Sequence, residues 1–374
     1  MRILHLIHSE GVYGAELILL YLAREQQRRG HEVGVASMRD PNTQQTPFEK
    51  LAVAYGLTVM PLRIAPRPTP AVIGTLRRCA REVRAQVLHS HGYKADILLG
   101  LLPRRARPPT VTTLHGWTSA GRLSKLGLYE RLDRWAIRRL EATVVVARSM
   151  LALPALRAVA PARRHLIENG IPSRAARLAD LASSGASAPP AELVDFMRRA
   201  PTLLAIGRLS PEKGFGLLLA AFAQARSAGA GAAQLLIIGA GPEAEALGRQ
   251  ITALGLSGAV RLGGYVAGAD RLLEHGAGFV MSSLTEGMPL VLMEALQWDV
   301  PILATAVGAI PDLLGTGAAG RLVPAGDVAA LAAGLTKLLS GAAPYAAPSA
   351  ALLTAHYSIE RMAADYLRLY EAIT

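Results

Sequence analysis

Two glutamates stand eight positions apart in the segment 282–295, in different surroundings. Pro289 suits the first position of a helix, which puts Glu286 on the preceding loop and Glu294 inside the helix among apolar neighbours. A carboxylate in so apolar a helix is expected to be buried and paired. Five residues of helix from Pro289 span roughly 7.5 Å. The two carboxylates are therefore predicted to hold hydroxyl-bearing groups, such as a sugar and a ribose, on either side of a diphosphate.

Two cations lie in the same half of the chain. Arg208 and Lys213 flank a turn within residues 207–215, between an expected strand and an expected helix. Two positive side chains beside the free N–H groups of a helix start make a good clamp for a diphosphate. We interpret them as phosphate-binding residues, with ordinary surface cations as the alternative.

Two histidines and a glycine turn occupy the corresponding places in the first half of the chain. His91 and His115 each follow an expected strand and precede a glycine, so both are predicted to point toward one ligand site. No third ligand stands at a suitable spacing, so zinc is not expected. The turn that ends at Gly14 opens a helix and lets backbone N–H groups approach an anion, although an ordinary tight turn has the same pattern.

The sequence Gly239-Ala240-Gly241 after a later strand favours a different ligand, a dinucleotide. The third position of that fingerprint is Ala244, a weaker match. The next strand ends in glycines where an acid would hold a ribose. We therefore keep the dinucleotide as a minor alternative.

Short apolar runs alternate with amphipathic segments through most of the chain, which predicts parallel sheets covered by helices on both faces. Ligands bind such sheets beyond the carboxyl ends of the strands, where the residues above stand. The expected strands are 2–7, 32–37, 57–60, 87–90, 110–114, 143–146, 165–168, 202–206, 234–238, 260–262, 278–281, 301–304 and 320–323.

The alternation breaks in residues 173–200, where a stretch rich in Ala, Ser and Pro is expected to connect two domains. The predicted organisation is an α/β chain with a first lobe at 1–172, a linker at 173–200 and a second lobe at 201–357. A length of 374 residues suits two such lobes.

The net charge of +12 is placed unevenly, because residues 1–172 carry +14 and residues 173–374 carry −2. Arg77, Arg78, Arg81 and Arg84 are spaced to share one helix face. Such a face suits anionic lipid head groups or a phosphorylated acceptor, and a solvated surface is the alternative. No nucleic-acid-binding motif accompanies the charge, so nucleic acid is not an expected partner.

Cys79 is the only cysteine, which excludes an intramolecular disulfide and fits a reducing compartment such as the cytoplasm. The apolar run at the N-terminus is too short for a signal peptide. No run of about 18 apolar residues suggests a membrane span. We expect a cytoplasmic protein, either soluble or peripheral on a membrane.

The ordered set of these segments resembles family 4 of the retaining glycosyltransferases, which have the GT-B fold of two Rossmann-like lobes with a cleft between them. The resemblance covers nearly the whole chain, and Glu286 and Glu294 fit the family's E-x7-E pattern without a gap. The other matching segments are Gly14-Ala15-Glu16, Ser90-His91-Gly92, Leu114-His115-Gly116, Asn169-Gly170-Ile171, Gly207-Arg208-Leu209, Glu212-Lys213-Gly214 and Gly239-Ala240-Gly241-Pro242.

The resemblance implies roles at matching positions. Glu286 would contact hydroxyls of the donor sugar and Glu294 those of the ribose, while Arg208 and Lys213 would neutralise the departing diphosphate. His115 would sit beside the transferred sugar. Further substrate-binding positions are Gly14, Glu16 and His91 in the first lobe and Gly287, Met288, Pro289 and Leu290 in the second.

The implied reaction moves a hexose from a nucleotide-sugar donor to an acceptor hydroxyl with retention of configuration. No metal or other cofactor is expected, because the cations supply the positive charge. The basic first lobe favours a glycan or lipid-linked acceptor of the cell envelope or of an exopolysaccharide. A two-lobed enzyme that rearranges the sugar nucleotide, such as a 2-epimerase, is the alternative, and in this family the last helix, near 358–374, commonly packs on the first lobe.

Overall fold

The computed structural model describes residues 1–9, 11–40, 42–64, 69–116, 125–183, 188–315, 320–340 and 356–374. The chain forms two compact units. The first comprises Met1–Pro172 together with His356–Thr374, and the second comprises Ser173–Ala355.

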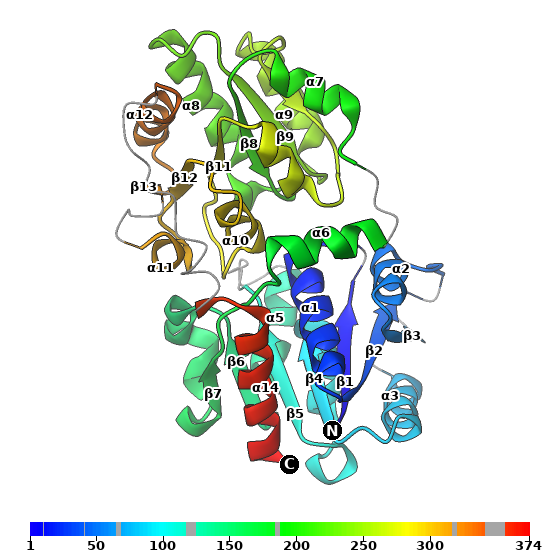
Figure 1. Cartoon of the computed structure of the whole chain (residues 1–374). Helices are drawn as coiled ribbons and strands as arrows, with labels where there is room; N and C mark the ends of the chain where they lie inside the picture. Colours follow the sequence, from blue (N-terminus) through cyan, green and yellow to red (C-terminus); the bar gives the residue numbers. More distant parts are fainter. Residues whose placement is uncertain are drawn as a thin grey trace. The chain divides into compact units, whose positions relative to one another are not determined.

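The first unit is built on a seven-stranded sheet in which every strand pair is parallel, in the order β3-β2-β1-β4-β5-β6-β7 (Figure 1). The order reverses between β1 and β4, which creates the switch point where such sheets bind ligands. The strands are β1 (Arg2–His8), β2 (Glu32–Arg39), β3 (Thr58–Arg63), β4 (Val87–His91), β5 (Thr110–Leu114), β6 (Ala142–Val145) and β7 (Arg164–Leu166).

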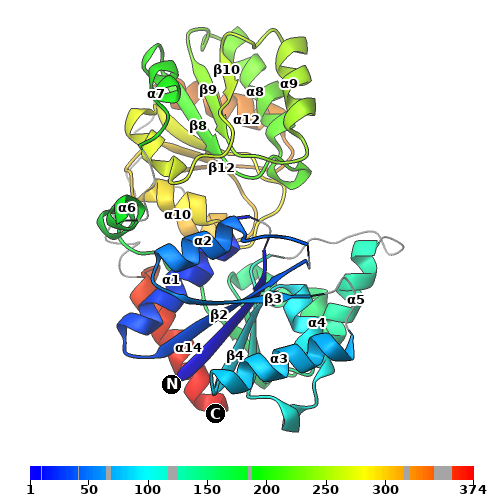
Figure 2. The same ribbon diagram turned by 90° about the vertical axis from the view of Figure 1, so that its right-hand side faces the viewer.

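Helices cover both faces of this sheet. Figure 2 shows α1 and α14 on one face and α3 and α4 on the other. The C-terminal helix α14 buries Tyr366 and Tyr370, and an isolated bridge between Ile171 and Ser358 ties its start to the end of the first segment. The helices are α1 (Gly14–Arg28), α2 (Pro47–Ala54), α3 (Pro70–Glu82), α4 (Tyr93–Leu101), α5 (Lys125–Ile137) and α14 (Ile359–Ile373), with short 3₁₀ turns at η1 (Arg104–Ala106), η2 (Arg148–Ala152), η3 (Pro154–Ala158) and η4 (Pro161–Arg163).

The second unit repeats the plan with a six-stranded parallel sheet in the order β10-β9-β8-β11-β12-β13, and its switch point lies between β8 and β11. Its strands are β8 (Thr202–Ile206), β9 (Gln234–Ile238), β10 (Val260–Leu262), β11 (Gly278–Met281), β12 (Ile302–Thr305) and β13 (Arg321–Val323). Its helices are α6 (Arg174–Ser183), α7 (Ala191–Arg198), α8 (Phe215–Ser227), α9 (Ala244–Ala253), α10 (Leu290–Leu296), α11 (Ile310–Leu314) and α12 (Val328–Leu339), with 3₁₀ turns η5 (Pro211–Lys213) and η6 (Ala269–His275).

All thirteen expected strands occur, with ends displaced by up to three residues. The predicted α/β class, with parallel sheets between helices, is confirmed. Apolar side chains of the strands and helices fill each core, including Leu4 and Leu88 in the first unit and Leu235 of β9 and Phe222 of α8 in the second. No helix within the described ranges is both long and apolar enough to cross a bilayer.

The expectation of a plain linker at 173–200 is wrong for its described part, while residues 184–187 lie outside the described residues. Helices α6 and α7 form there and belong to the second unit. The alanines that suggested a connection are strong helix formers. Leu193, Phe196 and Met197 recur at helical spacing on α7 and are buried, so this helix packs into the core of the unit.

Candidate functional site

An ion pair marks the switch point of the second unit. Lys213 Nζ lies 2.6 Å from Glu286 Oε1, joining the turn after β8 to the loop after β11. Only 8% of the Glu286 side chain is exposed, and the Ser283 hydroxyl donates to the same oxygen at 2.7 Å. Both residues were predicted to bind one donor, and the structure brings them into contact.

Hydrogen bonds hold the loops that carry this pair. The Ser282 hydroxyl donates to the Lys213 carbonyl at 2.9 Å, and the Thr305 hydroxyl of β12 donates to the Ser283 carbonyl at 2.6 Å. Gly308 adopts φ of +58°, and a Cβ atom there would lie 2.3 Å from the Glu286 carbonyl oxygen. A side chain at position 308 would therefore clash with the backbone of Glu286, so glycine is required there.

Arg208 is exposed on the loop after β8, five residues before Lys213. That loop packs on the glycine turn after β9, where Gly239 adopts φ of +149° and a Cβ atom would lie 1.8 Å from the Gly207 carbonyl oxygen. The Leu209 N–H also donates to the Ala240 carbonyl at 3.0 Å. The glycines suggested for a dinucleotide thus serve the close approach of two loops.

Glu294 lies on α10 as expected, with 13% of its side chain exposed, and it shares a cation with Asp270. The guanidinium of Arg177 contacts Asp270 Oδ2 at 2.8 Å and Glu294 Oε1 at 3.3 Å. The Trp298 indole N–H donates to Asp270 at 2.9 Å. Arg177 comes from α6, so the stretch expected as a linker supplies the partner of the second glutamate.

The charge balance around Glu294 shifts its protonation. Burial and the nearby Asp270 raise the pKa of Glu294 and Arg177 opposes both, which leaves it at about 8. A carboxyl with this pKa is largely protonated at neutral pH, so it can donate as well as accept a hydrogen bond. Pro289, expected at the first helical position, is instead the residue that caps α10, one position earlier.

The other predicted residues of this segment lie on or beside the loop before α10. Gly287, Met288 and Leu290 are buried there, and the Gly287 carbonyl accepts from the Ala309 N–H at 2.8 Å. The backbone at Gly287 is therefore tied to the loop after β12, next to Glu286.

A cavity of about 280 Å³ lies at the carboxyl ends of β1, β4 and β5 in the first unit. Its walls combine apolar and polar groups, and His91, His115 and Glu16 are among them as predicted. Asp133 of α5 also lines it, and burial together with the neighbouring Asp96 raises the pKa of Asp133 to about 9. Asp133 is thus an uncharged hydrogen-bonding group at neutral pH. The cavity is lined by Ile7, His8, Ala15, Glu16, His91, Gly92, Tyr93, Thr113, Leu114, His115, Gly116, Tyr129, Glu130 and Asp133.

The predicted residues His91 and His115 contact each other directly, through a bond of 2.9 Å between His91 Nδ1 and His115 Nε2. The other nitrogen of His91 faces His5 Nδ1 at 3.1 Å, so both of its ring nitrogens are occupied within the protein. His91 therefore positions His115 instead of offering a ring nitrogen to a ligand. Glu16 likewise accepts from the Tyr13 N–H at 3.1 Å, which caps the helix that Gly14 begins.

Two groups of functional interest escaped the sequence analysis. His89 and His91 stand two apart on one strand, and that spacing places both rings on the same face, a signal that was available. Their contact with His5 depends on the pairing of β1 with β4. Arg177 and Asp270 are 93 positions apart, and no local pattern links them.

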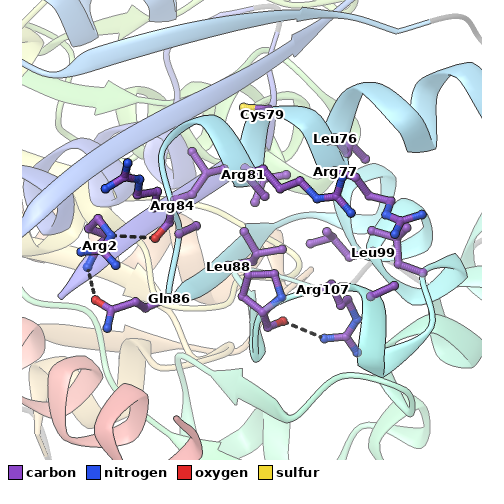
Figure 3. A pocket seen from close by; sticks show the side chains of 17 residues that line it. Arg2, Leu76, Arg77, Cys79, Arg81, Arg84, Gln86, Leu88, Leu99 and Arg107 are labelled. Atoms are coloured by element: carbon purple, nitrogen blue, oxygen red, sulfur yellow. Dashed lines mark hydrogen bonds between the residues drawn. The ribbon is translucent and has the colours of Figure 1, made fainter.

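A second cavity of about 350 Å³ lies at the opposite end of the first sheet, near the amino ends of β1, β4 and β5. Figure 3 shows Arg77, Arg81 and Arg84 along one side of it, with Leu88 and Leu99 between them and Arg107. The expected helix face is shorter than predicted, because α3 ends at Glu82 and Arg84 follows with φ of +48°. Arg107 is balanced by Glu141.

Two protein-family models match the chain. Residues 12–174 match the model described as Glycosyltransferase Family 4, and residues 200–341 match the model described as Glycosyl transferases group 1. The two matches fall on the first and the second unit.

Named relatives agree with these matches. A phosphatidyl-myo-inositol mannosyltransferase of Mycobacterium leprae is 29% identical over 96% of this chain and 93% of its own length. The amylovoran biosynthesis glycosyltransferase AmsK of Erwinia amylovora is 32% identical over 41% of this chain and 39% of its own length. The crystal structure of Anabaena Alr3699/HepE in complex with UDP and glucose aligns over both whole chains with a TM-score of 0.81 at 19% identity, which confirms the GT-B fold.

Replacing Arg177 by Met should destabilise the second unit by about 3–5 kcal/mol, because two largely buried carboxyl groups would lose the cation they share. Urea unfolding followed by circular dichroism measures the change. Arg174→Met is the matched control on the same helix, since Arg174 is exposed and contacts the Gln297 carbonyl and the Trp298 ring. Equal effects of the two substitutions would contradict the role given to Arg177.

Acid should destabilise the first unit through its buried histidines. Burial lowers the pKa of His5 to about 4, whereas an unfolded histidine titrates near 6.5. Between these values the unfolded chain binds a proton that the folded chain does not, so stability falls as the pH falls from about 6.5 toward 4. One such group gives a slope of roughly 1.4 kcal/mol per pH unit.

Hydrogen exchange of the β1 amides, corrected for intrinsic rates, measures this slope. His356→Gln, which changes an exposed histidine, should leave the slope unchanged. A stability that does not vary between pH 6.5 and 4.5 would show that the buried rings are not held neutral.

Proposed function

Because the chain belongs to family 4 of the glycosyltransferases and has the GT-B fold, it is a glycosyltransferase, and we propose that it transfers a hexose from a nucleotide-diphosphate sugar to an acceptor hydroxyl with retention of configuration. The contact between Lys213 and Glu286 at the second unit's switch point carries this proposal. In this contact, a cation that can bind a phosphate is hydrogen-bonded directly to a carboxylate that can accept from hydroxyl groups.

The roles proposed for the donor site follow from charge. Glu286 accepts hydrogen bonds from sugar hydroxyls, and Lys213 with Arg208 stabilises the negative charge that grows on the leaving diphosphate. Interactions that strengthen as this charge develops accelerate the reaction, while uniform binding does not. Glu294, with its raised pKa, exchanges hydrogen bonds with ribose hydroxyls.

The acceptor is proposed to bind in the first unit, at the cavity lined by Asp133, with the transferred sugar beside His115 of the same cavity. Neutral histidine and neutral carboxyl groups suit hydroxyl-rich ligands, because hydrogen bonds with hydroxyls need no charge. Gly14 and Glu16 at the start of α1 stand at the same edge of the sheet, where the donor phosphate is proposed to approach Gly14. No metal and no other cofactor take part in the proposed reaction.

The names of relatives support a role in cell-envelope or exopolysaccharide synthesis. One relative is named for mannosyl transfer to a phosphatidyl-inositol and another for amylovoran biosynthesis. These names support the proposal that the acceptor of this enzyme is a glycan or a lipid-linked sugar. No observation of the described residues favours the 2-epimerase alternative.

The enzyme is further proposed to work in the cytoplasm, at an anionic membrane surface that it contacts through the basic cavity of the first unit. Arg77 and Arg81 line that cavity beside leucine side chains, which suits a ligand with a phosphate and an apolar portion (Figure 3).

Lys213→Ala should lower kcat by about 100- to 1,000-fold, the usual effect of removing one group that stabilises transition-state charge. Nucleoside diphosphate release from a panel of UDP-, GDP- and ADP-hexoses measures it, with the acceptor supplied as a membrane extract. Lys337→Ala, an exposed lysine on α12, is the control and should keep full activity. Near-normal turnover in Lys213→Ala would rule out the proposed clamp.

Arg77→Gln/Arg81→Gln should weaken binding to vesicles of phosphatidylglycerol and phosphatidylcholine by about tenfold or more at low salt, since each arginine near an anionic surface contributes about 1 kcal/mol. Vesicle sedimentation measures this binding. Arg198→Gln/Arg199→Gln removes the same charge from the exposed end of α7 in the second unit and should have little effect. If the wild type ignores anionic vesicles, the membrane proposal fails and the donor site is unaffected.

A further inference from the structure

A continuous chain of hydrogen bonds runs through the first unit from the C-terminal helix to His115. Tyr370 contacts Gln26 at 3.4 Å, Gln26 contacts His5 at 2.8 Å, His5 contacts His91 at 3.1 Å, and His91 contacts His115 at 2.9 Å. We call these five residues the histidine chain. It links α14 to the cavity at the strand ends, and Tyr370, Gln26 and His5 are fully buried.

A branch leaves the histidine chain at Tyr370. The Tyr370 hydroxyl lies 2.6 Å from His89 Nδ1, His89 Nε2 lies 2.8 Å from the Thr113 hydroxyl, and Thr113 lies 2.8 Å from the Tyr366 hydroxyl. All six ring nitrogens of His5, His89 and His91 are engaged in this way. The three rings have nitrogens within 4.8 Å of one another, but a metal ion would have to break these bonds to gain its ligands.

The direction of the bonds follows from the shortest contact. A separation of 2.6 Å is typical of a hydroxyl donor and short for an N–H donor, so the Tyr370 hydroxyl donates to His89 Nδ1. Neutral His89 then carries its hydrogen on Nε2 and donates it to Thr113. The single proton of Tyr370 is used, so its oxygen can only accept from Gln26.

This fixes the orientation of Gln26 and of every ring after it. Gln26 turns its amino group to Tyr370 and its carbonyl oxygen to His5 Nε2, which must donate. His5 Nδ1 then accepts from His91 Nε2, and His91 Nδ1 accepts from His115 Nε2. Neutral His115 is left with a lone pair on Nδ1. Reversing one bond would require the whole buried chain to reverse together, because a clash of two donors or two acceptors is costly where water is excluded.

The rings are held neutral by the same burial. It lowers the pKa of His5 and of His115 to about 4 and the pKa of His91 well below its usual value, the other rings adding to the effect at His91. The direction argued above therefore applies at physiological pH.

We propose that Tyr370 and Gln26 are positioning residues that hold His115 as the tautomer protonated on Nε2, so that its Nδ1 accepts a hydrogen bond from one hydroxyl of the sugar substrate. The bond between His115 and a sugar hydroxyl rests on the proposed function, whereas the tautomer of His115 does not. His115 thereby selects a hydroxyl as a ligand and disfavours a group that can only accept.

Nuclear magnetic resonance of the full chain with ¹⁵N-labelled histidine tests the tautomer at pH 7, with His115 assigned from the signal lost in His115→Gln. The expected wild-type signal is neutral His115 protonated on Nε2. In Tyr370→Phe the chain loses the hydroxyl that fixes its direction, so His115 should become a mixture of both neutral tautomers. Tyr366→Phe is the matched control, because it removes a buried hydroxyl from the same helix beyond Thr113, and it should leave His115 unchanged.

Three results would overturn the proposal: wild-type His115 protonated on Nδ1, wild-type His115 as an imidazolium, or the same tautomer in Tyr370→Phe as in the wild type. Histidine signals that shift on adding Zn²⁺ to the wild type would also contradict it, since the rings would then be metal ligands.

Kinetics with monodeoxy donors test the contact itself. On the intact donor, His115→Ala and Tyr370→Phe should lower kcat/KM, by about tenfold for His115→Ala. On the one deoxy donor that lacks the bonded hydroxyl, neither substitution should lower kcat/KM below the wild-type value for that donor. Tyr366→Phe should match the wild type on every donor. Equal losses on every deoxy donor would contradict the contact. If the wild type transfers no sugar at all, the proposed function fails, and the tautomer measurement still decides the positioning role.

Discussion

The second unit depends on the requirement that a carboxylate taken out of water must meet a cation. Glu286 is almost fully covered, and Lys213 with Ser283 satisfies its oxygen. Glu294 and Asp270 share Arg177, and burial together with the nearby Asp270 raises the pKa of Glu294. The loops after β8 and β11 and the helix α6 are held in place by these pairs, so the arrangement that stabilises the unit also assembles the proposed donor site.

The histidine chain and its branch in the first unit satisfy buried polar groups without charge. Their side chains are histidines, a glutamine, tyrosines and a threonine that satisfy one another through directed hydrogen bonds. A neutral network avoids the desolvation cost of buried ions, at the expense of sensitivity to acid. The contrast suits the proposed division of labour, in which the second unit holds a charged nucleotide diphosphate and the first holds hydroxyl groups.

The sequence predicted the parts of this molecule that are encoded locally. Apolar runs located every strand, and glycines, cations and acids after those strands located the loops at both switch points, because parallel sheets collect their strand ends at one edge. The placement of Lys213 and Glu286 at one site followed from that rule, while their direct contact did not. Residues 173–200 were predicted to be a linker, but their alanines favour a helix as readily as a connection. Only packing against the rest of the unit decides between the two.

The remaining contacts depend on tertiary structure. Arg177 meets Asp270 across 93 positions, and Gln26 meets Tyr370 across 344, so no spacing in the sequence announces either pair. The hydrogen-bond partners of His91 could not be predicted for a similar reason, since its contact with His5 forms only when β1 pairs with β4.

Locating the bound donor tests the proposed donor site of the second unit directly. Hydrogen exchange of the full chain, read by mass spectrometry with and without each of a panel of UDP-, GDP- and ADP-hexoses, reports which backbone segments a donor covers. The accepted donor should slow exchange in residues 207–214 and 283–297. Protection confined to residues 239–244, or transfer activity without any change in those two segments, would contradict it.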